Sequence, residues 1–531
     1  MIDLSHHDLV SLLVLLAAGA GMLVLVPKLR IPYPILLVLG GLALGFVPGL
    51  PEIDLPPDLV LVGILPLLLY GAAFFTSLRD LRSNLRPVGL LAVGLVLLTM
   101  VIVAVVAHEI VPGLPWAAAF VLGAVVSPTD PIAATAIMHR LGVPRRIVSI
   151  VEGESLVNDG TALVAYRAAV VATVSGVFSI WEAGASFVLN VTGGVVVGLG
   201  VAWIVRQVRK RLDYPPAEVT ISLLTGYFAY IPAELMGVSA VIAAVTAGIY
   251  LGWRTPELTS FQTRLSGSAV WEIFTFVINA VLFALIGLQL PSILDALTGY
   301  AGTKLVWWGV LVTGTVVVTR LVFVPVFTYL PKRIGGSFGG NNPAPPLNRS
   351  VVVAWAGMRG AVSLAAALAV PLTTNGGSSF PQRDLIVFLT FCVILGTLVF
   401  QGLTLPMLIS VLGVEADHLD EKEEAKARIK AADAAIARLS ELESEDWVRD
   451  DTAERLRGLY GFRRNRFASR FDRDDDGAIE EQSLSYQRLR RELLDAERSE
   501  LVNLRREGVI SSDVERRLHR DLDLEDARLD V

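Results

Sequence analysis

The chain has 531 residues, of which 53% are hydrophobic and only 18% are charged, and its mean hydropathy is +0.59. This composition excludes an ordinary soluble globular protein and predicts an all-α, polytopic membrane protein. Charge is unevenly placed, because residues 415–531 carry 23 Lys/Arg and 32 Asp/Glu whereas residues 1–414 carry a net charge of +3. We therefore expect a transmembrane domain at 1–414 and an acidic tail at 415–531, with a lipid bilayer rather than a nucleic acid as partner.

Thirteen apolar runs of spanning length, or close to it, follow one another along the first domain. The run at 239–251 is short, and merging it with the preceding one would change the parity of every later span. The runs lie at 9–27, 33–48, 59–76, 87–106, 116–138, 148–173, 183–205, 217–234, 239–251, 265–290, 304–329, 350–371 and 383–411.

Lysines and arginines cluster in alternate loops, beginning with Lys28 and Arg30 and ending with Lys332, Arg333 and Arg349. By the positive-inside rule these loops are cytoplasmic, which puts the N-terminus outside and the tail in the cytoplasm. This topology needs an odd number of spans and so favours thirteen. We expect a multi-pass protein of the inner (plasma) membrane.

The stretch Ser127–Thr161 reads SPTDPIAATAIMHRLGVPRRIVSIVEGESLVNDGT and places polar groups inside two apolar runs. Pro128 and Pro131 bracket Thr129 and Asp130. Each proline removes a backbone N–H and disfavours the α region for the residue before it, so this helix should open into two halves. Freed carbonyls facing a cavity at mid-bilayer suit a cation-binding transporter.

The next run carries Glu154, Ser155, Asn158 and Asp159 within a turn and a half of one helix. Their spacing brings Ser155 onto one face with Asn158 and with Asp159. A packing role is the alternative for Asp159, but a carboxylate at this depth is functional by default. We expect a proton and a metal cation to compete for Asp159.

Two arginines also lie at membrane depth, Arg320 and Arg359, where an unpaired charge costs at least a few kcal/mol. Their partners should be among the carboxylates at similar depth, and a structural ion pair is the commoner role for such residues. Gly357 and Gly360 flank Arg359 and would let its helix loosen. With the first and last six runs as inverted repeats, this segment corresponds to the broken fifth run, and two interrupted helices in matching halves indicate a transporter site.

The strings SPTDP, EGESLVNDGTA, WAGMRGAVSL and WEIFTFVINAVLFALIGLQL resemble the monovalent cation:proton antiporter-1 family, the bacterial sodium/proton antiporters related to animal sodium/proton exchangers. The resemblance implies the sodium/proton antiporter fold with two broken, crossing helices, a homodimer, a dimerisation bundle and a six-helix core. It further implies that Asp159 alternately holds a proton or Na⁺ near Thr129, Ser155 and the bracing Asn158, that Glu154 pairs with Arg320, and that Asp130 lies near Arg359. Some relatives carry a glutamate where this chain has Gly71, so any role of that side chain is absent here.

For several other polar residues we expect structural roles and not ion binding. Glu234, Glu272, Asn279 and Gln289 are interpreted as helix-packing or boundary groups, with shaping of a funnel as the rarer alternative. In the mostly helical tail, Asp472, Asp474, Asp476 and Gly477 mimic a calcium loop, but its twelfth position is Ser483, so a solvated acidic turn is the ordinary interpretation. A regulatory partner for the tail stays unspecified.

Three function classes compete. A secondary antiporter needs a buried titratable carboxylate on a broken-helix core, which the pattern provides. A cation channel would show a repeated filter loop, and an intramembrane aspartyl protease would need a recognisable aspartate motif. The sequence shows neither of these two features. We therefore expect a transporter and not an enzyme, without a cofactor, that exchanges Na⁺ or Li⁺ for H⁺. A K⁺/H⁺ antiporter is the alternative, because the same oxygen ligands suit each cation. With Asp130 and Glu154 both occupied by arginines, a single free carboxylate predicts electroneutral exchange.

Overall fold

The computed structural model describes residues 32–47, 55–177, 179–333, 346–414, 419–469, 478–527 and 529. The predicted span 9–27 and the acidic part of the calcium-like loop lie outside these ranges. The chain divides into two compact units, Met1–Ala416 and Asp417–Val531, and each is described by itself. Every helix or strand element in the described ranges is a helix, apart from an isolated bridge between Thr373 and Ser379.

The first unit holds the helices of the membrane domain, three of which contain π-helical segments (η). In chain order they are α2 (Tyr33–Gly45), η1 (Leu59–Ile64), α3 (Leu65–Phe75), α4 (Leu78–Ser83), α5 (Leu85–Gly89), η2 (Leu90–Leu95), α6 (Val96–Ile110), α7 (Trp116–Val126), α8 (Ile132–Arg140), α9 (Arg145–Ser175), α10 (Ile180–Arg209), α11 (Pro215–Leu235), α12 (Ala240–Leu258), α13 (Phe261–Leu288), α14 (Leu290–Asp295), α15 (Gly302–Arg333), α16 (Leu347–Trp355), α17 (Ala361–Leu368), α18 (Arg383–Gly396), η3 (Thr397–Gln401) and α19 (Gly402–Val411).

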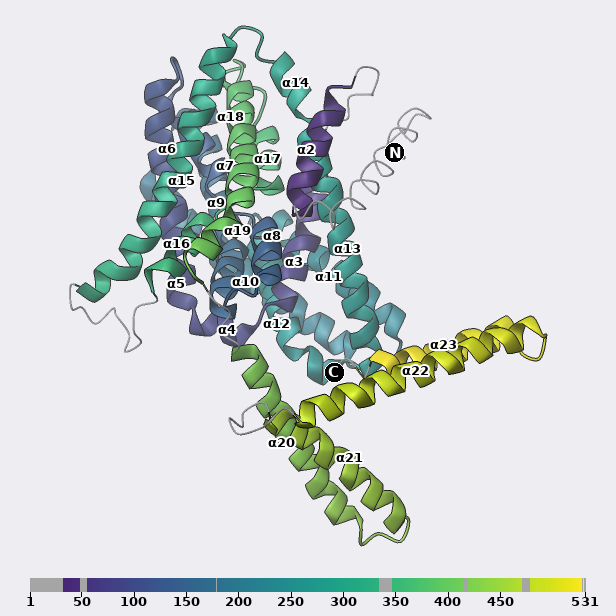
Figure 1. Ribbon diagram of the computed structural model, residues 1–531. Helices are drawn as coiled ribbons and strands as arrows, with labels where there is room; N and C mark the ends of the chain where they lie inside the picture. The colour runs from purple at the N-terminus through teal and green to yellow at the C-terminus, as the bar shows by residue number, and fades with distance from the viewer. Residues whose placement is uncertain are drawn as a thin grey trace. The chain divides into compact units, whose positions relative to one another are not determined.

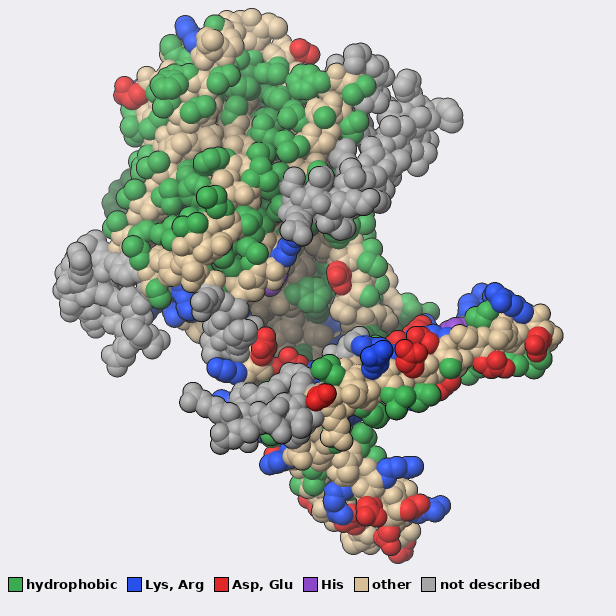
Figure 2. All heavy atoms as spheres, in the orientation of Figure 1, with side chains coloured by type: hydrophobic (Ala, Val, Ile, Leu, Met, Phe, Trp, Pro, Cys, Tyr) green, Lys and Arg blue, Asp and Glu red, His purple; other side chains and the backbone are tan. Residues whose placement is uncertain are grey.

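Twelve of the thirteen predicted apolar runs fall on these helices, and the remaining one is the span at 9–27. The short run at 239–251 is a helix of its own, because Gly237 (φ +71°) turns the chain after α11 and the Ser239 hydroxyl accepts the Ile242 N–H at the start of α12. Apolar side chains cover much of the outer surface of this unit (Figure 2), as expected for helices that face lipid. Five described segments are long and apolar enough to cross a membrane on their own: Leu85–Ile110, Ile180–Arg209, Phe261–Asp295, Gly302–Thr328 and Arg383–Val411.

Two membrane segments are broken where the sequence predicts it. Helix α7 ends at Val126 and α8 begins at Ile132, across the SPTDP motif, while α16 ends at Trp355 and α17 begins at Ala361, across the Gly357–Gly360 segment. The two non-helical stretches meet, because the backbone N–H of Asp130 donates to the carbonyl of Met358 at 2.8 Å. One segment therefore supplies a backbone partner that the other lost when its helix opened.

The helices form two groups that share a boundary (Figure 1). We call α2, η1, α3 and α10 to α13 the bundle, in which α2 packs on α13 and α12 packs on α3, α10 and α11. We call α5 to α9 and α15 to α19 the core, in which α7 packs on α6 and α9, and α15 packs on α16 and α18. The two broken segments belong to the core, and α9 and α17 meet the bundle along the boundary.

The second unit consists of two helical hairpins. They are formed by α20 (Leu419–Leu442) with α21 (Asp450–Ser469) and by α22 (Ala478–Arg506) with α23 (Ser512–Ala527). Ser511 caps α23 by accepting the N–H of Val514 at 3.3 Å. Arg498 joins the second hairpin by donating to Asp523 and Asp526.

Candidate ion-binding site

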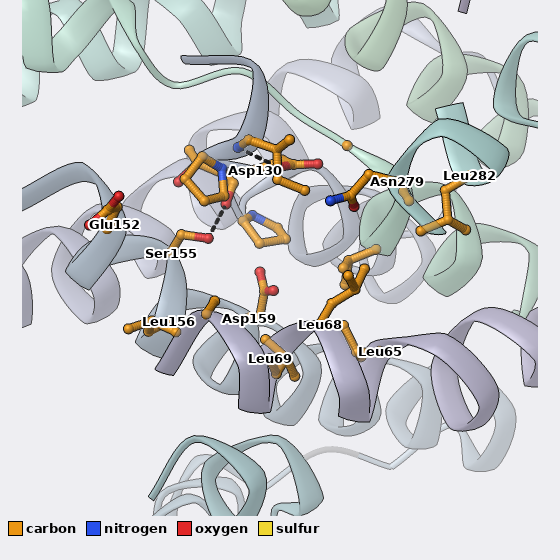
Figure 3. A pocket seen from close by; sticks show the side chains of 18 of the residues that line it. Leu65, Leu68, Leu69, Asp130, Glu152, Ser155, Leu156, Asp159, Asn279 and Leu282 are labelled. Atoms are coloured by element: carbon orange, nitrogen blue, oxygen red, sulfur yellow. Dashed lines mark hydrogen bonds between the residues drawn. The ribbon is translucent and has the colours of Figure 1, made fainter. Parts of the chain in front are cut away.

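A cavity of about 280 Å³ lies between the core and the bundle, beside the break between α7 and α8 (Figure 3). Its core wall is polar and includes Thr129, Asp130, Ser155 and Asp159. Its bundle wall is mostly apolar, with Val60 and Ile64 from η1 and with leucines and phenylalanines from α3 and α13. The cavity thus gathers, on one side, most of the residues that the sequence proposes as ion ligands.

Asp159 is buried, with 6% of its surface exposed, and it lines the cavity from α9. Figure 3 shows its carboxylate pointing into the open space, toward Asp130 and away from its own helix. Among the residues that the structure describes, no hydrogen bond or ion pair occupies this carboxylate. Asp159 is therefore available to a mobile charge inside the cavity.

Thr129 organises the polar wall. Its hydroxyl donates to Glu154 Oε1 at 3.3 Å and accepts from Asn158 Nδ2 at 2.7 Å, while its carbonyl accepts the Ser155 hydroxyl at 2.9 Å. These bonds are possible because Pro128 and Pro131 keep Thr129 outside any helix, so its carbonyl has no helical partner. Asn158 is fully buried, and its amide donates to the Thr129 hydroxyl.

Glu154 and Arg320 form a buried ion pair between α9 and α15, with 1% and 2% of their side chains exposed. Arg320 Nη1 donates to Glu154 Oε1, and Nη2 donates to Oε2 at 2.7 Å. The same guanidinium donates to the carbonyls of Ala354 at 3.0 Å and Val353 at 3.1 Å, at the C-terminal end of α16. Arg320 thus balances a carboxylate and also satisfies carbonyls that the broken helix leaves without partners.

The predicted neighbourhood of Asp130 needs a correction. Its backbone contacts Met358, but its carboxylate forms no ion pair with Arg359 among the described residues. Asp130 Oδ1 instead accepts the N–H of Ile132 at 2.9 Å, at the first turn of α8, and Oδ2 lies so close to Gly360 that a Cβ there would overlap it. The N-terminal ends of two half-helices therefore surround this carboxylate, and their free N–H groups favour negative charge.

Arg359 also differs from the prediction, because no described Asp or Glu pairs with it although it is only 1% exposed. Its Nη1 donates to the carbonyl of Gly357 at 3.3 Å, and its backbone N–H donates to the Thr397 hydroxyl at 3.0 Å. Among the described residues the guanidinium thus has this carbonyl of the non-helical segment as its partner, and its Nε has none. The prediction failed because it considered only carboxylates as partners.

Two residues of the bundle have places that sequence reasoning did not assign. Gly71 does not line the cavity, and a Cβ at this position would meet the ring of Trp271 at 2.7 Å, so it faces into the bundle. Asn279 lines the cavity, which is closer to the rarer, funnel-shaping alternative than to the packing role expected for it. The signal was an amide in the middle of the apolar run FVINAVLFALIGL, since polar groups at membrane depth are costly.

The cavity extends from Asp159 toward only one end of α9. Its lining includes Ser155 and Glu152, in the direction of the basic start of this helix, and no residue of α9 beyond Asp159. On the other side, Arg167 Nη2 donates to both carboxylate oxygens of Glu234 on α11, at 2.6 and 2.8 Å. Along α9 the lining therefore runs from Asp159 toward the end that carries the basic residues Arg145 and Arg146.

We predict that Glu154→Gln lowers the free energy of unfolding by about 3–5 kcal/mol, because it strands the Arg320 charge in the interior. Thermal unfolding of the purified protein in detergent measures this loss. The control is Arg167→Gln, which removes a half-exposed pair and should cost at most about 1 kcal/mol. A Glu154→Gln protein that melts with the wild type would contradict the assigned partnership.

Comparison with known proteins places this site in a family. The family model described as "Sodium/hydrogen exchanger, transmembrane" matches residues 12–411. An uncharacterized Na⁺/H⁺ exchanger of Mycobacterium tuberculosis is 35% identical over 98% of this chain and 96% of its own length. A sodium, potassium, lithium and rubidium/H⁺ antiporter of Bacillus pumilus is 33% identical over 78% of this chain and 63% of its own length.

A solved structure shares the fold. The sodium proton antiporter MjNhaP1 from Methanocaldococcus jannaschii at pH 8 superposes with a TM-score of 0.60, covering 77% of this chain and 100% of that one, at 21% identity. Its likeness supports the helical arrangement described above, with two interrupted helices beside the cavity. Because the family model spans the membrane domain and a relative aligns over nearly the whole chain, the protein belongs to the sodium/hydrogen exchanger family.

Proposed function

We propose that the protein is a secondary antiporter that exchanges a monovalent cation, Na⁺ or Li⁺, for H⁺ by alternating access. The observation that carries the proposal is the state of Asp159, which is buried, faces the cavity and has no protein partner among the described residues. An ionised carboxylate in such a place is strongly disfavoured unless a positive charge joins it. A proton or an alkali cation provides that charge, so the two compete for one site.

The neighbours of Asp159 fit the cation half of the cycle. The Ser155 hydroxyl and the Thr129 carbonyl lie on the same wall, and both offer oxygen atoms with further lone pairs beyond the bond that joins them. Hard cations prefer such oxygen ligands. Thr129, Ser155 and Asp159 are therefore our proposed metal ligands, with Asn158 and the Glu154–Arg320 pair holding Thr129 and α9 in place.

Sidedness follows from the basic loops. The positive-inside rule makes the loops with Arg79, Arg82, Arg145 and Arg146 cytoplasmic, so the cavity opens to the cytoplasm and the Arg167–Glu234 side is external. We further propose an inner-membrane homodimer with an external N-terminus and a cytoplasmic tail that binds a regulatory partner. Closure on one side argues against a cation channel, because a channel needs a continuous path.

A K⁺/H⁺ antiporter is the second candidate, because the Bacillus pumilus relative is named for potassium and rubidium as well as sodium and lithium. The proposed ligands are a carboxylate, a hydroxyl and a carbonyl, and all alkali cations accept these. Exchange by purified protein in proteoliposomes, with Na⁺, Li⁺ and K⁺ offered in turn, distinguishes the candidates.

Asp159→Asn should abolish exchange while leaving the protein folded, because the amide holds neither a transferable proton nor a charge for the cation. The measurement is cation-driven movement of protons in proteoliposomes, read with a pH-sensitive dye in the lumen. An unchanged melting temperature shows that the loss is not one of folding. Proton flux that still depends on the cation in this variant would refute Asp159 as the carrier.

We also propose that exchange is electroneutral. Glu154 has Arg320, and the Asp130 carboxylate has the N-terminal ends of α8 and α17 in place of the arginine expected from the sequence. Both countercharges are fixed parts of the core, which leaves Asp159 as the carboxylate that exchanges its load. One proton then replaces one monovalent cation, and no net charge crosses the membrane.

Exchange should accordingly be insensitive to membrane potential, whereas one net charge would gain or lose about 2.3 kcal/mol per 100 mV. The test clamps the potential of proteoliposomes with a K⁺ ionophore while both ion gradients are held constant. A rate that scales with the imposed potential would show that a second group titrates. The same measurement on Asp130→Asn identifies that group, because the potential dependence would disappear in this variant if Asp130 were responsible.

A further inference from the structure

Asn279 is the exception on the apolar wall of the cavity. It belongs to α13 of the bundle, is 2% exposed and lies among Leu65, Leu68 and Leu282. Figure 3 shows its side chain reaching into the cavity from the wall opposite Asp159, on the side of Asp130. Thr76 is the other polar residue of the described bundle wall, and its hydroxyl donates a hydrogen bond to the Ala72 carbonyl.

The amide oxygen of Asn279 lacks a partner. Among the described residues nothing donates to this Oδ1, although the atom is buried. Leaving such an acceptor without a hydrogen bond is costly, and replacing the amide with an apolar side chain of similar size would remove that cost. An amide oxygen is also a good ligand for a hard cation or for the water that such a cation carries.

We propose that Asn279 binds the transported cation, through Oδ1 or one water held by Oδ1, only while the site faces the cytoplasm. This inference rests on the proposed antiport function. The core supplies Thr129, Ser155 and Asp159, which keep their mutual geometry when the core moves, whereas Asn279 is fixed in the bundle. Any movement of the core relative to the bundle therefore separates Asn279 from the other ligands.

A ligand present in one conformation changes the affinity of that conformation alone. With Asn279 in place, the cation binds more tightly from the cytoplasm than from outside, which suits a carrier that collects a scarce cytoplasmic cation for export. Proton binding involves Asp159 and not Asn279, so the half-saturating proton concentration should not depend on this residue. Asn279 thus makes the cation affinity higher on the cytoplasmic face than on the outer face.

The test compares the two faces of the membrane. Everted vesicles expose the cytoplasmic face and right-side-out vesicles expose the outer face, and the half-saturating Na⁺ concentration is measured in each for wild type and Asn279→Leu. We expect a rise of about three- to tenfold on the cytoplasmic face, the range that one lost hydrogen bond of ordinary strength gives. The value on the outer face and the half-saturating proton concentration should stay as in the wild type.

Gln401→Leu is the matched control. Gln401 is 1% exposed, its Oε1 also lacks a described partner, and it does not line the cavity, so its replacement removes a comparable amide without touching the cation. Half-saturation on both faces should be unchanged in this variant. Asn279→Ser withdraws the oxygen but keeps a small polar group, so it should show the same one-sided rise even where the leucine variant does not reach the membrane.

The possible results distinguish a failure of the proposal for Asn279 from a failure of the proposed antiport function. Equal rises on the two faces, or no rise on either, would overturn the proposal for Asn279 while leaving antiport intact. A lower melting temperature and rate with unchanged half-saturation would make Asn279 a structural residue and also overturn it. Wild-type vesicles that exchange no alkali cation for protons would refute the proposed function itself, and the role of Asn279 with it.

Discussion

The structure depends on the need to satisfy polar backbone groups where two membrane helices are broken. Lipid offers no hydrogen-bond partner at this depth, so each freed N–H and carbonyl must find one inside the protein or in the cavity. The protein uses three kinds of partner: the opposite broken segment, a side chain of the same segment, and an arginine from a neighbouring helix. The opposite segment contributes through the backbone bond from Asp130 to Met358, and the same segment through the bond from Ile132 to the Asp130 side chain. The arginine is Arg320, which donates to the carbonyls at the end of α16.

Meeting this need determines which groups remain free for ions. Thr129, Ser155 and Glu154 are all engaged with one another, and Glu154 is neutralised by Arg320. The carboxylate of Asp159 is left without such a bond among the described residues, although it lies on the same helix as Glu154. Two acidic residues five positions apart thus have different surroundings: Glu154 is paired with an arginine, and Asp159, which we propose as the group that changes its load, faces the cavity.

The sequence predicted those parts of this arrangement that depend on local chemistry. Pro128 and Pro131 disfavour a continuous helix, and Gly357 and Gly360 let their helix loosen, so the residue types locate both breaks, whereas the crossing of the two segments was expected from the family resemblance. The pairing of a buried arginine with a buried carboxylate followed from the cost of burying an unpaired charge. Both arguments need only the identity of the residues and their depth in the membrane.

Lateral contacts were harder to predict, because depth does not decide which side of a helix faces which neighbour. Arg359 and Asp130 lie in segments that meet, yet each side chain bonds to a backbone group and not to the other, and such backbone partners carry no sequence signature of their own. The sequence also does not show which neighbour the Asn279 side of α13 contacts, because this depends on how α13 packs on α2. Asn279 was therefore interpreted mainly as a packing group. In contrast, α12 could be separated from α11 by the loop charges, because merging the two runs would change the parity of every later span.

The bond between Asp130 and Met358 also bears on how the protein is made. Its acceptor follows its donor by about 230 residues, so the first broken segment enters the membrane long before its partner has been synthesised. At a synthesis rate of roughly 5 to 20 residues per second, the wait is about 10 to 50 s. During this time the open SPTDP segment must be shielded by water, by lipid headgroups or by the insertion machinery. Biogenesis therefore passes through a stage in which the segment that we propose as part of the ion site is a polar defect in the bilayer.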